Sequence, residues 1–207
     1  MCKSNNRARP ASSREYRWRG QPARVFFARS RCVLPLGEES LIQATRTAST
    51  TAAESIAPDA GALLALPMVE LLGMLRRGEV SPVGVLEACI DRFAAVNPTL
   101  NALVADPFDA ALEEAAAAER EYATSAHPRP LLGIPFTVKE MIQVSGMPLT
   151  FGSLVRRDRR ATADATVVAR LRAAGAIPVG VTNVPEWGMW TESYNHLYGR
   201  TSNPHDP

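Results

Sequence analysis

The fold is decided by the stretch GIPFTVKE (133–140) and by two later segments, DATVVARLRAAG (164–175) and AIPVGVTN (176–183). The first and third are short apolar runs next to Gly or Pro residues, which is typical of buried strands. The middle segment has the residue spacing of a helix. A strand, a helix and a strand in this order predict a βαβ unit, in which the two strands are parallel and the crossover is right-handed.

The predicted crossover helix carries its own start and stop signals. Asp164 stands at its beginning, and Gly175 occupies a position where a glycine commonly ends a helix. We expect its inward face to hold Val167, Val168 and Leu171.

Polar residues stand at the ends of both predicted strands. Lys139 ends the first strand, and Thr182 and Asn183 end the second. Because catalytic groups in parallel sheets lie where strands end, we expect these residues to share one edge of the sheet. Lys139 is also unusual in kind, since only Lys3 and Lys139 among the 23 basic residues are lysines. This preference for arginine elsewhere indicates that position 139 needs an amine.

The residues themselves leave two interpretations of Lys139 open. A lysine at a strand end is commonly solvated, protects a sheet edge, or forms an ion pair, here with Glu140. The alternative is a general base, because burial favours the neutral form of an amine and arginine cannot lose its proton. The apolar residues that would desolvate the amine are Ile134, Phe136, Val138 and Met141.

Helices are predicted before the first strand, over residues 66–80, 81–98 and 106–123. Ser81 has the position of an N-cap for the second of them, and Asp106 for the third. We expect the pair Asn97-Pro98 to stop the second helix. Helices followed by the βαβ unit predict an α/β fold.

The N-terminal residues differ in charge from the rest of the chain. Residues 1–31 hold nine basic residues and one acid, Glu15, whereas 14 basic and 20 acidic residues make the remainder mildly acidic. We predict that residues 1–60 form a basic, disordered extension and linker, and residues 61–207 a domain. The alternatives for the extension are a transit peptide and an arm that stacks on single-stranded nucleic acid. The acidic body argues against a nucleic-acid-binding domain.

Several functional classes lack their sequence signals. The three cysteines form no CxxC pair, so we expect no disulfide framework and interpret Cys89 as a helix core residue of a cytoplasmic protein. No Walker loop, G-x-G-x-x-G, G-x-S-x-G or H-E-x-x-H motif is present, and we expect no cofactor. No apolar run approaches the roughly 20 residues of a membrane span. We also expect no metal, because no metal-ligand spacing connects His127, His196 and His205.

Three ordered segments resemble the N-terminal part of the amidase signature family: PLLGIPFTVKEMIQVSGMPLTFGS (130–153), ADATVVARLRAAGAIPVGVTNVPEW (163–187) and TESYNHLYGRTSNPHD (191–206). Within that family, GMPLTFGSLVRRD and MWTESYNHLYGRTSNP are most similar to the fatty-acid amide hydrolase branch. The resemblance implies an α/β fold with helices packed on a mixed β-sheet. That sheet would be incomplete here, because the chain ends early.

The resemblance also implies a Ser-cisSer-Lys mechanism with Lys139 as the general base. Lys139 would take a proton, through a bridging serine, from a nucleophilic serine that attacks an amide carbonyl, and water would release the acid from the acyl-enzyme. Glu140 stands where many members carry Asp, and it would orient the local loop. Gly188, Met189 and Trp190 would border the acyl pocket, and their apolar character suits a hydrophobic or fatty-acid amide.

Both serines of that mechanism are expected beyond the last residue, Pro207. The family's Gly-Gly-Ser-Ser-Gly-Gly signature, which carries the bridging serine, does not occur in these 207 residues. We therefore predict an inactive fragment of an amidase, since base and nucleophile act as one unit. The serines that stand in other motifs and do not match the catalytic positions are Ser145, Ser153, Ser193 and Ser202.

Two other functions stay open at this point. A glutamine amidotransferase A-type subunit shares the fold and triad, although the apolar segment MWTESYN (189–195) suits glutamine poorly. The other is a non-enzymatic half-domain binding protein that uses the basic arm. For the amidase we expect a small-molecule amide as partner, no nucleic acid and no transmembrane segment, and the resemblance allows a homodimer.

Overall fold

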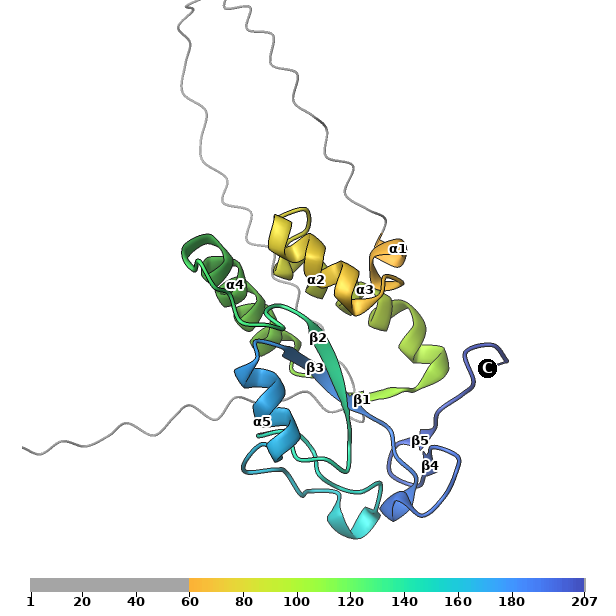
Figure 1. The fold of residues 1–207 in the computed structure, drawn as a ribbon. Helices are drawn as coiled ribbons and strands as arrows, with labels where there is room; N and C mark the ends of the chain where they lie inside the picture. Colours follow the sequence, from red (N-terminus) through yellow and green to blue (C-terminus); the bar gives the residue numbers. More distant parts are fainter. Residues whose placement is uncertain (1–59, 207) are drawn as a thin grey trace, which may run out of the picture. The chain divides into compact units, whose positions relative to one another are not determined.

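The computed structural model describes residues 60–206 of the chain (Figure 1). The extension predicted over residues 1–60 lies outside the described residues, apart from Ala60. The helices are α1 (Ala60–Leu64), α2 (Met68–Arg77), α3 (Pro82–Leu100), α4 (Phe108–Thr124) and α5 (Thr166–Ala173), with 3₁₀ turns η1 (Leu154–Arg156) and η2 (Glu186–Gly188). The strands are β1 (Leu103–Ala105), β2 (Pro135–Lys139), β3 (Ile177–Thr182), β4 (Tyr194–Asn195) and β5 (Gly199–Arg200).

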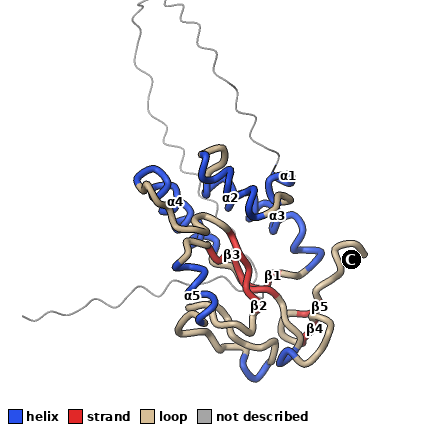
Figure 2. Tube along the Cα trace, viewed as in Figure 1, coloured by secondary structure: helices blue, strands red, loops and turns tan. Residues whose placement is uncertain are grey.

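The predicted βαβ unit is confirmed. β2 and β3 pair in parallel, with Pro135 opposite Ile177 and Lys139 opposite Thr182, and α5 lies between them in the chain. β1 joins the other side of β3 in antiparallel orientation, so the sheet is mixed, in the order β1-β3-β2 (Figure 2). β1 itself was not predicted. Its three residues are all buried, and so short a run shows no alternation in the sequence.

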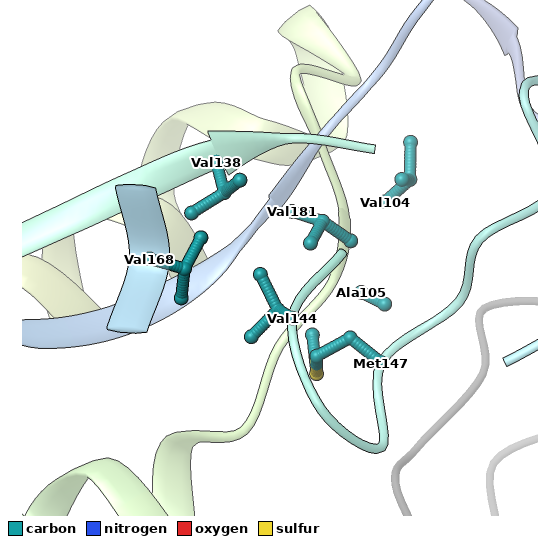
Figure 3. Close-up of a cluster of buried hydrophobic side chains, with 7 residues drawn as sticks. All are labelled: Val104, Ala105, Val138, Val144, Met147, Val168 and Val181. Atoms are coloured by element: carbon teal, nitrogen blue, oxygen red, sulfur yellow. The ribbon is translucent and has the colours of Figure 1, made fainter. Parts of the chain in front are cut away.

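Hydrophobic side chains cover β3 on both sides. Towards α3 and α4, Ile177 and Val179 pack with Leu86, Ala111 and Ala115. A second cluster joins β2 and β3 to α5 and to the loop after β2, and the side chains of this cluster point toward one another in Figure 3. Its members are Val104, Ala105, Val138, Val144, Met147, Val168 and Val181. Two covered faces explain why the strand is a continuous apolar run.

The inward face of α5 is narrower than predicted. Val168 is 1% exposed and Leu171 is half-buried, but Val167 is 54% exposed, so the prediction for Val167 was wrong. The helix has only eight residues and meets the core through Val168. Successive residues of a helix point about 100° apart around its axis, so Val167 faces away from the core when Val168 faces it. The predicted Gly175 stop is confirmed by its φ of 97° directly after the C-cap Ala174.

The helix start at Ser81 is confirmed, since Gly84 N donates to Ser81 Oγ at 3.0 Å. The start of α4 differs from the prediction: Pro107, not Asp106, occupies the N-cap position, and it makes no side-chain cap. The predicted N-cap position was therefore one residue early.

The predicted stop of α3 at Asn97-Pro98 was wrong, because the helix continues through Pro98 to Leu100. Pro98 cannot donate to the carbonyl four residues earlier, and the helix continues for only two residues beyond it. The buried Asn97 instead fixes the chain beyond the helix: its Nδ2 donates to Leu103 O, and its Oδ1 accepts from Leu103 N, both at 2.8 Å. The helix ends at Leu100, and the C-cap residue Asn101 has a left-handed φ of 51°.

Candidate active site

The carboxyl ends of β2 and β3 lie at one edge of the sheet, as predicted. Lys139 pairs with Thr182 in the parallel register, and the next backbone amide, Glu140 N, donates to Thr182 O at 3.0 Å. The strand ends therefore bring Lys139 beside Thr182 and Asn183.

The Lys139 side chain is half-buried and contacts a hydroxyl group. Its Nζ lies 3.2 Å from Ser193 Oγ, and within residues 60–206 it forms no ion pair. The ion pair with Glu140 that the sequence left open was therefore wrong. The predicted desolvating residues Ile134, Phe136 and Val138 pack into two hydrophobic clusters.

Glu140 is completely buried and turned to other partners. Its Oε1 accepts hydrogen bonds from Thr150 N and, at 3.3 Å, from the Tyr198 hydroxyl. Its Oε2 is buried and makes no hydrogen bond to any described residue. Burial raises the pKa of the Glu140 carboxyl above its ordinary value, while the hydrogen bonds from Thr150 and Tyr198 act in the opposite direction. These contacts connect the loop after β2 to the segment after β4, and the loop-orienting role of Glu140 stays a prediction.

Two buried asparagines attach the β4–β5 hairpin to the end of β3. Asn183 Nδ2 donates to Gly199 O and Thr201 Oγ1, both at 3.0 Å. Asn195 Nδ2 donates to Asn183 Oδ1 at 2.8 Å and to Val184 O at 2.7 Å. The sequence placed Asn183 at a strand end but did not indicate this network, because its partners come from a hairpin of two-residue strands.

The predicted acyl-pocket residues Gly188, Met189 and Trp190 lie at η2 and directly after it, and all three are exposed. The turn rests on the loop after β2: Trp187 N donates to Phe151 O at 2.8 Å, and the two rings are 5.6 Å apart. A side chain at Gly188 would come within 2.9 Å of Met141 Cε. The predicted pocket residues thus stand next to the loop that begins at Glu140.

The contact between Ser193 and Lys139 was not predicted from the sequence. Of the four serines set apart from the catalytic positions, Ser193 is the one whose hydroxyl meets Lys139 in the described part of the chain. Ser153 is buried, and Ser145 is held through its backbone by Asp164. The arrangement offers an amine and a hydroxyl at a sheet edge.

The described residues also bear on metal sites and on membrane spans. Over residues 60–206 no group of three or more His, Cys, Asp or Glu side chains could hold a metal. Within the same range, no helix is both long and apolar enough to cross a membrane.

Comparison with known proteins gives consistent results. The family model described as Amidase matches residues 84–207. Fatty-acid amide hydrolase 2-A of Danio rerio is 49% identical over 156 residues, which cover 72% of this chain and 29% of that protein. The A-type subunit of the glutamyl-tRNA(Gln) amidotransferase of Salinispora tropica is 36% identical over 144 residues, or 70% of this chain and 29% of that protein.

A solved structure agrees with these matches. A bacterial aryl acylamidase, described as one of the amidase signature enzymes, superimposes with a TM-score of 0.65 at 29% identity, covering 68% of this chain and 30% of that one. The chain therefore spans about 30% of the length of the proteins it matches.

Proposed function

Because the chain belongs to the amidase family, we propose that Lys139 acts as the general base in the hydrolysis of a carbon–nitrogen amide bond. The observation that carries the proposal is the environment of the amine. Lys139 ends a parallel strand, is half-buried, and contacts the Ser193 hydroxyl at 3.2 Å instead of a carboxylate. The strand end thus presents an amine next to a hydroxyl group, at the sheet edge where catalytic groups of such sheets lie.

The proposed reaction follows the family mechanism that the sequence resembles. The neutral amine of Lys139 takes a proton, relayed by a bridging serine, from a nucleophilic serine, whose oxygen attacks the amide carbonyl carbon. The carbon–nitrogen bond breaks, the amine leaves with a proton, and water hydrolyses the acyl-enzyme. These 207 residues contain no Gly-Gly-Ser-Ser-Gly-Gly segment. We infer that both serines come from polypeptide outside this sequence, and that the 207 residues alone do not hydrolyse amides.

The proposed substrate is an amide with a long apolar acyl group. The exposed Met189 and Trp190 supply apolar surface next to the loop that begins at Glu140. Similarity to a fatty-acid amide hydrolase at 49% identity supports the same substrate class. The 36% identity to an amidotransferase component supports glutamine as the second candidate.

A chimera tests both candidates. Residues 61–207 replace the matching N-terminal part of the Danio rerio fatty-acid amide hydrolase 2-A, whose remaining polypeptide is to supply the serines. We expect hydrolysis of a long-chain primary fatty-acid amide, measured as ammonia release, and little hydrolysis of L-glutamine. A higher kcat/KM for glutamine would favour the amidotransferase, and the isolated 207-residue chain serves as the inactive control.

A further inference from the structure

Ser193 and Lys139 meet although 54 positions separate them in the chain. The contact joins the end of β2 to the residue directly before β4, and both residues are half-buried. Ser193 matches neither of the two serines in the family mechanism, so the function proposed above assigns it no role.

The backbone of Ser193 is fixed from two sides. Its carbonyl oxygen accepts from Thr201 N at 2.9 Å and from Asn183 Nδ2 at 3.4 Å. Asn183 is itself 2% exposed and follows β3, the neighbour of the strand that carries Lys139. The hydroxyl is therefore presented to the amine from a position tied to the same sheet edge.

A hydroxyl suits this place because it can both accept and donate a hydrogen bond. It accepts from a charged ammonium group and donates to a neutral amine, so it can hold the amine before and after proton transfer. A carboxylate in the same place would favour the charged form alone. The neighbouring carboxyl, Glu140, accepts through its Oε1 from Thr150 and Tyr198.

We propose that Ser193 is a positioning residue, whose hydroxyl holds Lys139 Nζ at the sheet edge in both protonation states. This inference rests on the base role of Lys139 for its functional meaning. The contact between Ser193 and Lys139 can be measured without any hydrolysis. A failure of the positioning role can therefore be distinguished from a failure of the base role.

The chain offers a direct spectroscopic test, because Lys3 and Lys139 are its only lysines. In the 207-residue chain labelled with [13C]lysine, Lys139→Arg removes one of two sets of signals and so assigns it. A side chain held in one conformation gives two separate Hε resonances. We expect Ser193→Ala to merge the two Lys139 resonances, and Ser193→Thr to keep them apart.

Controls separate the contact from general unfolding. Ser202 lies on the same segment, and its backbone N donates to Leu100 O at 2.9 Å. Ser202→Ala keeps this backbone contact, so it should leave the Lys139 signals unchanged. The valine methyl spectrum reports folding. If Ser193→Ala unfolds the chain, Ser193→Cys fills the space with a weaker hydrogen-bonding group and should give the same merging. Unchanged Lys139 resonances in a folded Ser193→Ala or Ser193→Cys chain would overturn the proposal.

A covalent probe tests the competing role of Ser193 as a nucleophile. The 207-residue chain is treated with a fluorophosphonate, which loses fluoride when a reactive serine oxygen attacks its phosphorus, and the labelled peptide is found by mass spectrometry. We expect no label on Ser193. Labelling of Ser193 that disappears in Lys139→Ala would contradict a purely positioning role.

Discussion

Asn183 and Asn195 share a buried hydrogen bond of 2.8 Å, from Asn195 Nδ2 to Asn183 Oδ1. Through it, the end of β3 holds the hairpin that begins beside Ser193, and Ser193 in turn contacts Lys139. The surroundings of Lys139, the proposed base, thus depend on the side-chain amides of Asn183 and Asn195, which form no hydrogen bond with Lys139 themselves.

Replacing Asn195 by alanine should destabilise the fold substantially. The change leaves Asn183 Oδ1 and Val184 O without the amide donor, and Leu197 N and Tyr198 N without their acceptor. We expect the free energy of unfolding, measured by urea denaturation, to fall by about 2–3 kcal/mol. The exposed Asn203→Ala is the control and should cost less than about 0.5 kcal/mol. Equal effects of the two changes would refute the structural role of the network.

Replacing Glu140 by glutamine should change how stability depends on pH. Burial raises the pKa of Glu140 in the folded chain above 4.5, so the folded state binds this proton more tightly than the unfolded state. Its contribution to stability is fully present below the unfolded pKa and is lost as pH rises through the folded pKa. Glutamine cannot ionise, so we expect the stability of the variant relative to the native chain to increase as pH rises above about 4.5.

Urea denaturation at a series of pH values measures this difference. The exposed Glu87→Gln is a matched control, for which the difference from the native chain should vary little with pH. If the Glu140→Gln and native stability curves run parallel, the carboxyl is not buried as described.

The thiol of Cys89 should react slowly. Burial in α3 raises its pKa from 9.0 to about 11, which lowers the thiolate fraction near pH 8 by about 100-fold. In a Cys2→Ser, Cys32→Ser variant, we expect the reaction with a disulfide reagent to be at least roughly tenfold slower than for a small thiol, because the greater nucleophilicity of a high-pKa thiolate offsets part of the loss. Urea should restore the ordinary rate. Fast reaction in the folded chain would show that Cys89 is accessible.

Trp190 tests the proposed acyl pocket. In the chimera, Trp190→Ala should raise KM for a long-chain amide roughly 10- to 150-fold, because an apolar side chain contributes about 1.5–3 kcal/mol when a ligand buries it. KM for a short-chain amide should change much less. Val155→Ala, at an 86% exposed apolar position outside the proposed site, is the control. Equal changes in KM for both amides would remove Trp190 from the pocket.

The sequence predicted the part of the fold that local patterns control. Gly and Pro positions, apolar runs and helix spacing were enough for the βαβ unit and for Lys139 and Thr182 at one edge. The errors arose where a single residue competes with the pattern, as at Pro98 inside α3 and at the exposed Val167 of α5. β1 escaped prediction because three residues are too few to show a period.

The contacts of the site could not be predicted from spacing. Ser193 lies 54 positions from Lys139 and reaches it through a hairpin of two-residue strands, which local sequence does not reveal. The asparagine network and the partners of Glu140 also join distant segments. The family resemblance assigned the base role to Lys139, which stays a prediction, and the structure adds which groups surround that residue.

The most direct test of the base role is the kcat/KM of Lys139→Arg in the chimera, with a long-chain fatty-acid amide as substrate. Arginine keeps the positive charge and much of the length of the side chain but cannot give up its proton. We predict a loss of roughly 10²- to 10⁴-fold, close to that of Lys139→Ala. Hydrolysis by Lys139→Arg at nearly the unsubstituted rate, in a chimera that melts at the same temperature, would contradict the account.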